Sequence, residues 1–107
     1  MIPKFRAWDK KKKIMNTVDG IHFDGDEVWE ISCHGVCWSN VRNYILMQST
    51  GLHDKNGNEI YIDDIVKDKN GYIYRMNMNN YDFVMRHSHL EFEIVGNVYE
   101  NADILGV

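Results

Sequence analysis

Two cysteines and two histidines are the side chains of this sequence best suited to holding a metal ion. Cys33 and Cys37 lie close together in the chain, and His87 and His89 alternate along a later segment. Two thiolates and two imidazoles can complete a tetrahedral zinc site. Cys33, however, continues an apolar alternation, and a free cysteine usually behaves as a small buried hydrophobic residue. We therefore expect reduced, buried thiols and surface histidines, with no bound metal.

Acidic side chains suggest two further chemistries, calcium binding and acid–base catalysis. The segment Asp54–Glu59 carries oxygen ligands, but its twelfth position is Ile65, where a calcium loop needs a bidentate glutamate. The neighbours Asp63 and Asp64 are predicted to point to opposite faces of a strand, so they do not form a catalytic pair. The sequence contains no Gly-x-Ser-x-Gly turn and no glycine-rich phosphate loop. It therefore predicts a hairpin at 54–59, no catalytic residues, no enzymatic activity and no cofactor.

A third candidate chemistry is electrostatic and involves Lys10, Lys11, Lys12 and Lys13. Residues 1–13 hold six cations against Asp9, whereas the remaining residues hold six cations against fifteen acids, and the net charge is −4. A basic edge can contact nucleic acid, but an acidic body disfavours binding along a long duplex. The favoured interpretation is a solvated hairpin tip between two strands. The four lysines are candidate nucleic-acid contacts under the alternative interpretation.

Length and composition describe the molecule that positions these side chains. The chain has 107 residues, 44% of them hydrophobic and 26% charged, which suits one globular domain. Its longest apolar run, residues 44–47, is too short to cross a membrane, and the first residues lack the apolar centre of a secretion signal. Two cysteines are too few for a disulfide scaffold. We expect a cytoplasmic protein with no membrane partner.

In the first half of the chain, alternation of apolar and polar residues predicts strands. They span residues 5–8, then 14–23 across the lysine turn, and then 27–33, where Trp29, Ile31 and Cys33 share one half-buried face. Residues 34–43 are expected to form a loop, with a short helical turn near Val41 as an alternative. Residues 44–48 are expected to form a further strand.

In the second half, turn residues divide the chain into short strands. Asn-Gly pairs at 56–57 and 70–71 predict type I′ turns, and two asparagines at 79–80 reverse the chain again. Strands are expected over 60–67, 72–78, 81–87 and 92–99. A helical turn follows at 102–105, capped by Asn101 and ended by Gly106. Short strands at this spacing are typical of a small antiparallel barrel.

Four aromatic residues of these strands have two possible roles. Tyr72, Tyr74, Tyr81 and Phe83 lie at alternating positions on two successive predicted strands. They are expected to face the core. The less favoured alternative is a stacking platform for single-stranded nucleic acid, for which cations are scarce nearby.

Four segments carry a resemblance to a known family. Ile2–Asp9 opens the chain, Leu46–Tyr61 is followed at once by Asp63–Val66, and Phe92–Asn101 closes it. In order and spacing they closely resemble the YopX family of small phage and prophage proteins of Gram-positive bacteria. Asp63 departs from the family pattern, which usually has glycine there, and Ala102 stands where proline is common. The resemblance leaves residues 20–43 and 70–90 as the variable parts.

The resemblance implies a β-rich fold with an SH3-like barrel in its C-terminal half and an N-terminal part that takes part in self-association. We therefore predict a mainly β chain, with one YopX-like domain over 1–107. Its N-terminal hairpin part spans 1–45 and its SH3-like barrel part spans 46–107. The resemblance implies no activity, so no catalytic or ligand residue carries over.

Phe5 and Trp8 are the candidate residues for self-association. They lie on opposite faces of the first predicted strand, so one of them needs a second layer, in the same chain or in a partner. The leading hypothesis is a non-enzymatic phage or prophage accessory protein in a bacterial host, which acts as a homo-oligomer and binds a phage or host protein. The alternative is a small nucleic-acid-binding or regulatory module that uses the lysine turn.

Overall fold

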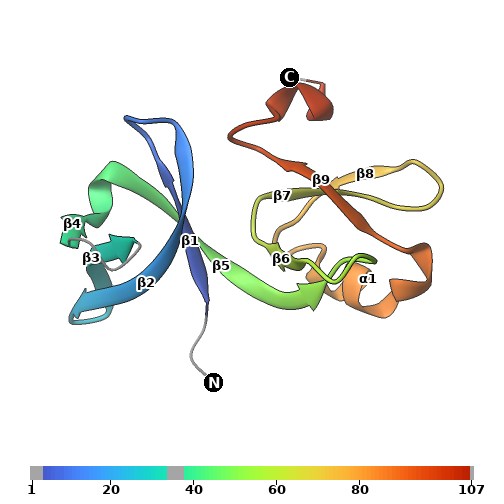
Figure 1. Cartoon of the computed structure of the whole chain (residues 1–107). Coiled ribbons are helices and arrows are strands. Elements are labelled where there is room, and N and C mark those ends of the chain that lie inside the picture. The colour runs from blue at the N-terminus through green and yellow to red at the C-terminus, as the bar shows by residue number, and fades with distance from the viewer. Residues whose placement is uncertain (1–3, 34–37, 107) are drawn as a thin grey trace. The chain divides into compact units, whose positions relative to one another are not determined.

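The computed structural model describes residues 4–33 and 38–106 and confirms that the protein is mainly β (Figure 1). The chain divides into two compact units after Gln48. We call residues 1–48 the first unit and residues 49–107 the second unit. The sequence had suggested two parts that meet between residues 45 and 46, and the strand β5 (Tyr44–His53) runs across both positions.

Antiparallel strands build the first unit, in the order β4-β3-β2-β1-β5. The strands predicted from alternation at 5–8, 14–23, 27–33 and 44–48 are confirmed. A loop was expected over 34–43. Of these residues the structure describes 38–43, which form a short strand and a 3-10 helix, and the 3-10 helix confirms the alternative of a helical turn. The elements are β1 (Phe5–Asp9), β2 (Ile14–Asp24), β3 (Glu27–Cys33), β4 (Trp38–Asn40), η1 (Val41–Asn43) and the start of β5.

The predicted half-buried face of β3 is wrong at one position. Ile31 is buried and Cys33 is half-buried, but Trp29 is 51% exposed. The register between β2 and β3 shifts between His22 and Phe23. Such a β-bulge breaks the regular alternation of side chains, which explains why the period of two fails beside it.

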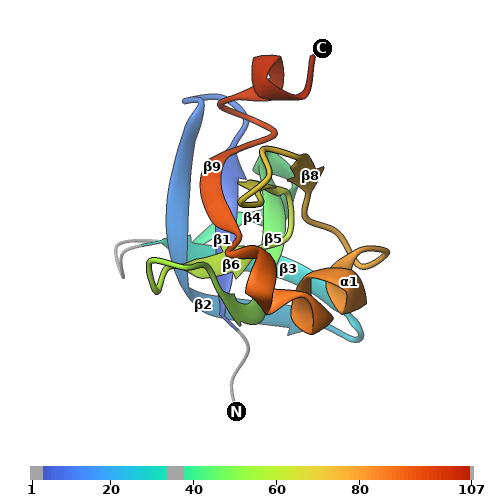
Figure 2. The same ribbon diagram turned by 90° about the vertical axis from the view of Figure 1, so that its right-hand side faces the viewer.

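The second unit contains the end of β5, a three-stranded antiparallel sheet of order β8-β7-β9, and one α-helix. Figure 2 shows the helix and the short 3-10 helix after it leading into β9. The SH3-like character of this part stays a prediction. The elements are β6 (Glu59–Tyr61), β7 (Asp64–Lys67), β8 (Ile73–Arg75), α1 (Tyr81–Arg86), η2 (Ser88–Leu90), β9 (Glu93–Asn97) and η3 (Ala102–Leu105).

The predicted strand at 81–87 is wrong, because this segment forms the helix α1. Val84 of this helix is buried in the core. Tyr81 precedes it by three residues, which is helical spacing, and packs against the same core. A turn held by two asparagines precedes the helix. The Oδ1 atom of Asn77 accepts hydrogen bonds from the backbone N–H groups of Asn79 (2.9 Å) and Asn80 (3.1 Å). The strand was predicted because aromatic and methionine side chains occupy every second position of this segment, a pattern that is also compatible with a short helix.

Three other predicted strands are shorter than expected, and one of them, at 92–99, is reduced to β9. The segment 60–67 divides into β6 and β7 at Asp63, whose φ of 72° is left-handed. At this turn the Asp64 carboxylate accepts a hydrogen bond from the Tyr61 backbone N–H at 2.7 Å. The predicted strand at 72–78 is reduced to β8, and Met78, at its expected end, is exposed.

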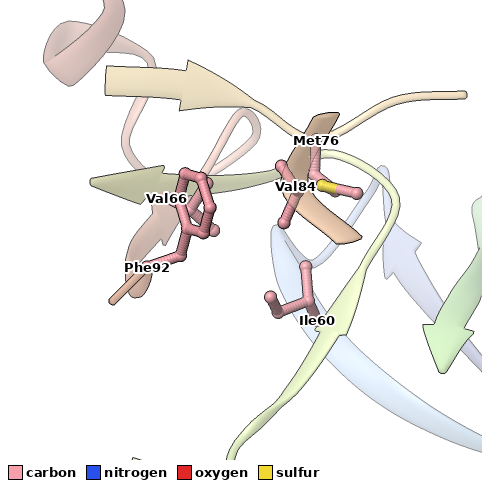
Figure 3. Packing of buried hydrophobic residues seen from close by; sticks show 5 residues of the cluster. All are labelled: Ile60, Val66, Met76, Val84 and Phe92. Carbon is pink, nitrogen blue, oxygen red and sulfur yellow. The ribbon is translucent and has the colours of Figure 1, made fainter. Parts of the chain in front are cut away.

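A core of apolar side chains holds the second unit together. Side chains from β6, β7, α1 and two connecting segments point into one space (Figure 3). Partly buried residues pack around them, Tyr74 and Tyr81 among them, which confirms that these two tyrosines belong to the core. The buried members are Ile60, Val66, Met76, Val84 and Phe92.

Two copies of the tetrapeptide Asp-Lys-Asn-Gly, at 54–57 and 68–71, form matching turns. In each copy the aspartate Oδ1 accepts hydrogen bonds from the backbone N–H groups two and four residues later, at 3.0 and 2.8 Å for Asp54 and at 2.9 and 3.0 Å for Asp68. The predicted positions of both turns are confirmed. Their type is wrong, because only Gly57 and Gly71 have positive φ, whereas a type I′ turn needs it at the asparagines too.

The C-terminal helical turn is confirmed as η3, and Gly106 ends it with a left-handed φ of 80°. Asn101 is at the predicted N-cap position, but its side chain makes no capping hydrogen bond. Its Oδ1 accepts a hydrogen bond from the Asn97 backbone N–H at 3.2 Å instead.

Candidate functional site

The side chains considered as metal ligands, although no bound metal was expected from the sequence, belong to different units where the structure describes them. Cys33 is half-buried in β3 of the first unit, and Cys37 lies outside the described residues. His87 and His89 belong to the second unit, with ring centroids 5.5 Å apart. Within residues 4–33 and 38–106, no three histidine, cysteine, aspartate or glutamate side chains are grouped to hold a metal ion.

The carboxylate that suggested calcium binding has a structural role. Asp54 is buried, its Oδ1 serves the turn, and its Oδ2 accepts a hydrogen bond from the Ile94 backbone N–H at 3.0 Å. Burial alone would raise the pKa of the Asp54 carboxyl, but the backbone donors Ile94, Asn58 and Asn56 outweigh it and hold this pKa below its ordinary value. The hairpin predicted at 54–59 is confirmed.

The carboxylate of the second turn is held in the same way. Asp68 Oδ2 accepts a hydrogen bond from the Tyr74 hydroxyl at 2.9 Å. Burial acts to raise the pKa of Asp68, but this hydroxyl and backbone N–H groups of the turn lower it overall. Burial, and then the bond to Asp68, raise the pKa of Tyr74. The expectation that Tyr72 and Phe83 also face the core is wrong, because both side chains are exposed.

Asp63 and Asp64, which were not expected to form a catalytic pair, bind separate partners. Asp63 Oδ1 accepts hydrogen bonds from Arg75 Nε (3.1 Å) and Nη2 (2.9 Å), and its Oδ2 accepts one from the Tyr99 hydroxyl at 2.7 Å. Asp64 accepts the Tyr61 backbone N–H described above. Asp63 therefore connects its turn to Arg75 and Tyr99, which are distant in the chain, whereas Asp64 stabilises the turn itself.

The run of four lysines forms the tip between β1 and β2, as predicted. Lys10, Lys11, Lys12 and Lys13 are all exposed. Asp9, which is buried, organises the turn: its Oδ1 accepts hydrogen bonds from the backbone N–H groups of Lys11 and Lys12, both at 2.9 Å. The Lys13 backbone N–H donates to the Asp9 carbonyl at 2.8 Å. The turn is therefore an ordered element that displays its side chains outward.

The lysine turn borders an open cleft of about 400 Å³, whose other wall is η1. The Lys10 ammonium donates to the Arg42 carbonyl at 3.0 Å, and the Lys10 backbone N–H donates to the Asn43 carbonyl at 3.2 Å. Sequence reasoning missed Arg42, because 32 residues separate it from Lys10. The sequence feature that could have pointed to Arg42 is its position between two asparagines, a residue type that favours turns.

Large aromatic side chains are exposed on β2, β3 and β4 of the same unit. We call the exposed rings of Phe23 (62% exposed), Trp29 (51%) and Trp38 (44%) the aromatic surface, a set defined by exposure alone. Phe23 follows His22 in β2 and therefore lies on the other face of the sheet from His22. The Trp38 ring stacks on His22 with centroids 3.7 Å apart. Gly20 leaves room for this ring, because an added Cβ would lie 2.7 Å from Trp38 Cη2.

The structure places the predicted self-association residues on opposite faces of β1, as expected. Phe5 pairs with Val18 and Trp8 pairs with Met15 in the register of β1 and β2. Phe5 is half-buried, and Trp8 is only 7% exposed in the single chain. Their role in self-association stays a prediction, and the larger exposed apolar area of this unit belongs to the aromatic surface.

Comparison with known proteins adds a family and a related structure. A family model described as YopX protein matches residues 4–106. The chain is similar to the crystal structure of protein EF1440 from Enterococcus faecalis, with a TM-score of 0.68 and 27% sequence identity over 98% of this chain and 99% of that chain. No match was found among the curated proteins. No helix in the described part of the chain is long and apolar enough to span a bilayer.

Proposed function

This chain belongs to the YopX family, and we propose that it is a non-enzymatic interaction module that self-associates through its first unit. The observation that carries the proposal is the aromatic surface. Large exposed apolar side chains are available to a partner, and tryptophan is enriched among the residues that contribute most to binding. Three such rings in a unit of this size favour a surface that is covered by a partner.

The free edge of the sheet supports the same proposal. Within the described residues β4 pairs on one side only, with β3, so its other side offers unpaired backbone groups. Exposed edge strands are templates for pairing with another chain, and proteins protect them with charges, proline or a very short strand. β4 carries Trp38, Ser39 and Asn40 and no charge. A second copy of the chain fits this edge because the same backbone pattern is present on both partners.

The buried carboxylates support a role without catalysis. Asp9, Asp54, Asp63, Asp64 and Asp68 each accept hydrogen bonds from backbone N–H groups, an arginine or a tyrosine. A general acid or base needs an ionisable group directed at a substrate. These carboxylates are committed to holding turns and strands.

The setting that we propose follows from the family resemblance. The oligomer would act in the cytoplasm of a bacterial host as an accessory protein of a phage or prophage. There it would present its surface to a phage or host protein.

A second candidate function is nucleic-acid binding through the lysine turn. It is favoured by four exposed lysines for which the described residues provide no acidic side chain as an ion-pair partner. Lys10 donates a hydrogen bond to the Arg42 carbonyl, and this neutral acceptor leaves the positive charge of the turn available to phosphate groups.

Sedimentation velocity over a series of protein concentrations tests self-association. We expect a mass above that of the 12.6 kDa chain, and Trp29→Ser should weaken association roughly 30-fold, corresponding to about 2 kcal/mol for a tryptophan at an interface centre. The matched control is Tyr72→Ser, which removes a 67% exposed ring from the second unit and should leave the mass unchanged. A wild-type chain that stays monomeric, or equal dissociation by both variants, would contradict the proposal.

A further inference from the structure

We propose that the cleft between the lysine turn and η1 binds the phosphodiester backbone of single-stranded nucleic acid. The proposal rests on the second candidate function, which it deepens by naming the site and its contacts. The three rings of the aromatic surface do not line this cleft, whereas Ser39 of the β4 edge does.

Positive charge dominates both walls of the cleft. Lys10, Lys11 and Lys12 line one wall and Arg42 lines the other. Asp9 is the acidic residue of the lining, and it is buried with one oxygen occupied by two backbone N–H groups. Four cations against this one carboxylate favour an anion that touches both walls.

Hydrogen bonds fix the two walls before any ligand arrives. The two bonds from Lys10 to the Arg42 and Asn43 carbonyls tie the turn to η1. Asn40 Oδ1 accepts hydrogen bonds from the Arg42 backbone N–H at 2.9 Å and from its Nε at 3.2 Å. The second bond orients the guanidinium and leaves its terminal nitrogens for a phosphate, which guanidinium binds in a planar, bidentate manner. A preorganised site loses less entropy on binding.

The lining and the charge distribution favour a single strand over other polyanions. Tyr44, which is half-buried, lines the same cleft and offers a ring on which a base can stack. Residues 49–107 hold ten acids against five cations, which disfavours long duplexes and anionic membranes. A flexible single strand can place only a few of its phosphates in the cleft, whereas a stiff duplex brings a longer row of phosphates to the protein.

Fluorescence anisotropy with a labelled DNA strand of about 12 nucleotides tests the site in the full-length chain. With four phosphate contacts, the slope of log affinity against log salt is about −2.8, so affinity should fall roughly 50-fold between about 50 and about 200 mM salt. Arg42→Gln should weaken binding and make the slope less steep by about 0.7. Arg42→Lys should keep the slope but bind more weakly, because a lysine lacks the planar fork. The matched control, Lys69→Gln, removes an exposed cation from the second unit and should change neither value.

Competition by inorganic phosphate, a duplex of equal length and anionic lipid vesicles identifies the ligand class. The proposal expects that none of these competitors matches the single strand. Displacement of the strand by millimolar phosphate, or tighter binding to duplex or vesicles, would overturn the assignment to single-stranded nucleic acid. Strand binding that Arg42→Gln and Lys69→Gln weaken equally would overturn the site while leaving the second candidate function standing. No strand binding at low salt would reject both.

Discussion

Asp54 shows at the residue scale how the second unit holds its sheet together. Its two carboxylate oxygens join a turn to the start of β9, and the next residue repeats the connection, because the Lys55 backbone N–H donates to the Phe92 carbonyl at 2.8 Å. In the second turn, the Lys69 backbone N–H donates to the Leu90 carbonyl at 2.7 Å. The two Asp-Lys-Asn-Gly turns therefore bind successive parts of one segment.

Asp54→Asn should destabilise the protein by about 1 kcal/mol at neutral pH, measured by urea unfolding. The asparagine oxygen can keep both bonds of the turn. Its amide nitrogen is a donor, however, and would face the Ile94 N–H, which loses its acceptor. Asp68→Asn is the matched control and should cost less, because a tyrosine hydroxyl faces the second oxygen there and can accept from the new amide.

The same carboxylate predicts a dependence of stability on pH. The pKa of Asp54 is lowered in the folded protein from the ordinary value of 3.8. Its contribution is therefore fully present above pH 3.8 and is lost as pH falls through the lower folded value. We expect the stability difference between wild type and Asp54→Asn to be larger at about pH 5 than at about pH 2.5. A difference that stays constant over this range would contradict this role of the carboxylate.

At the scale of elements, alternation and turn residues predicted the strands of the first unit and both Asp-Lys-Asn-Gly turns. These two patterns gave wrong predictions where hydrogen bonds or the conformation of single residues determine the path of the backbone. The left-handed Asp63 splits an apparently continuous strand, and the asparagines at 77 and 80 form a turn that begins α1. Arg42 reaches the lysine turn through a fold that brings distant segments together, and no local pattern reveals such a contact.

The helix α1 gives the test at this scale. Val84→Ala removes two buried carbons from the core and should cost about 2 kcal/mol in the free energy of unfolding. Met85→Ala is the matched control, since Met85 is exposed on the same helix and its loss should cost far less. Urea unfolding followed by far-ultraviolet circular dichroism measures both. An equal loss of unfolding free energy in both variants would contradict a special role of Val84 in the core.

At the scale of the whole molecule, charge and aromatic residues are unequally divided along the chain. Residues 1–48 hold seven cations against six acids and contain all three tryptophans, whereas residues 49–107 are strongly acidic. The first unit carries both proposed interaction sites. In the second unit, the buried carboxylates accept hydrogen bonds that stabilise the fold of that unit. We infer that binding is concentrated in the first unit.

Hydrogen–deuterium exchange at a low and a high protein concentration tests self-association by the first unit most directly. The account predicts that amides of β3 and β4 exchange more slowly at the high concentration, because a second copy covers the aromatic surface and the free edge of β4. Amides of β7 and β8 in the second unit should not respond to concentration. Unchanged exchange in β3 and β4, or slowing confined to the second unit, would contradict the account.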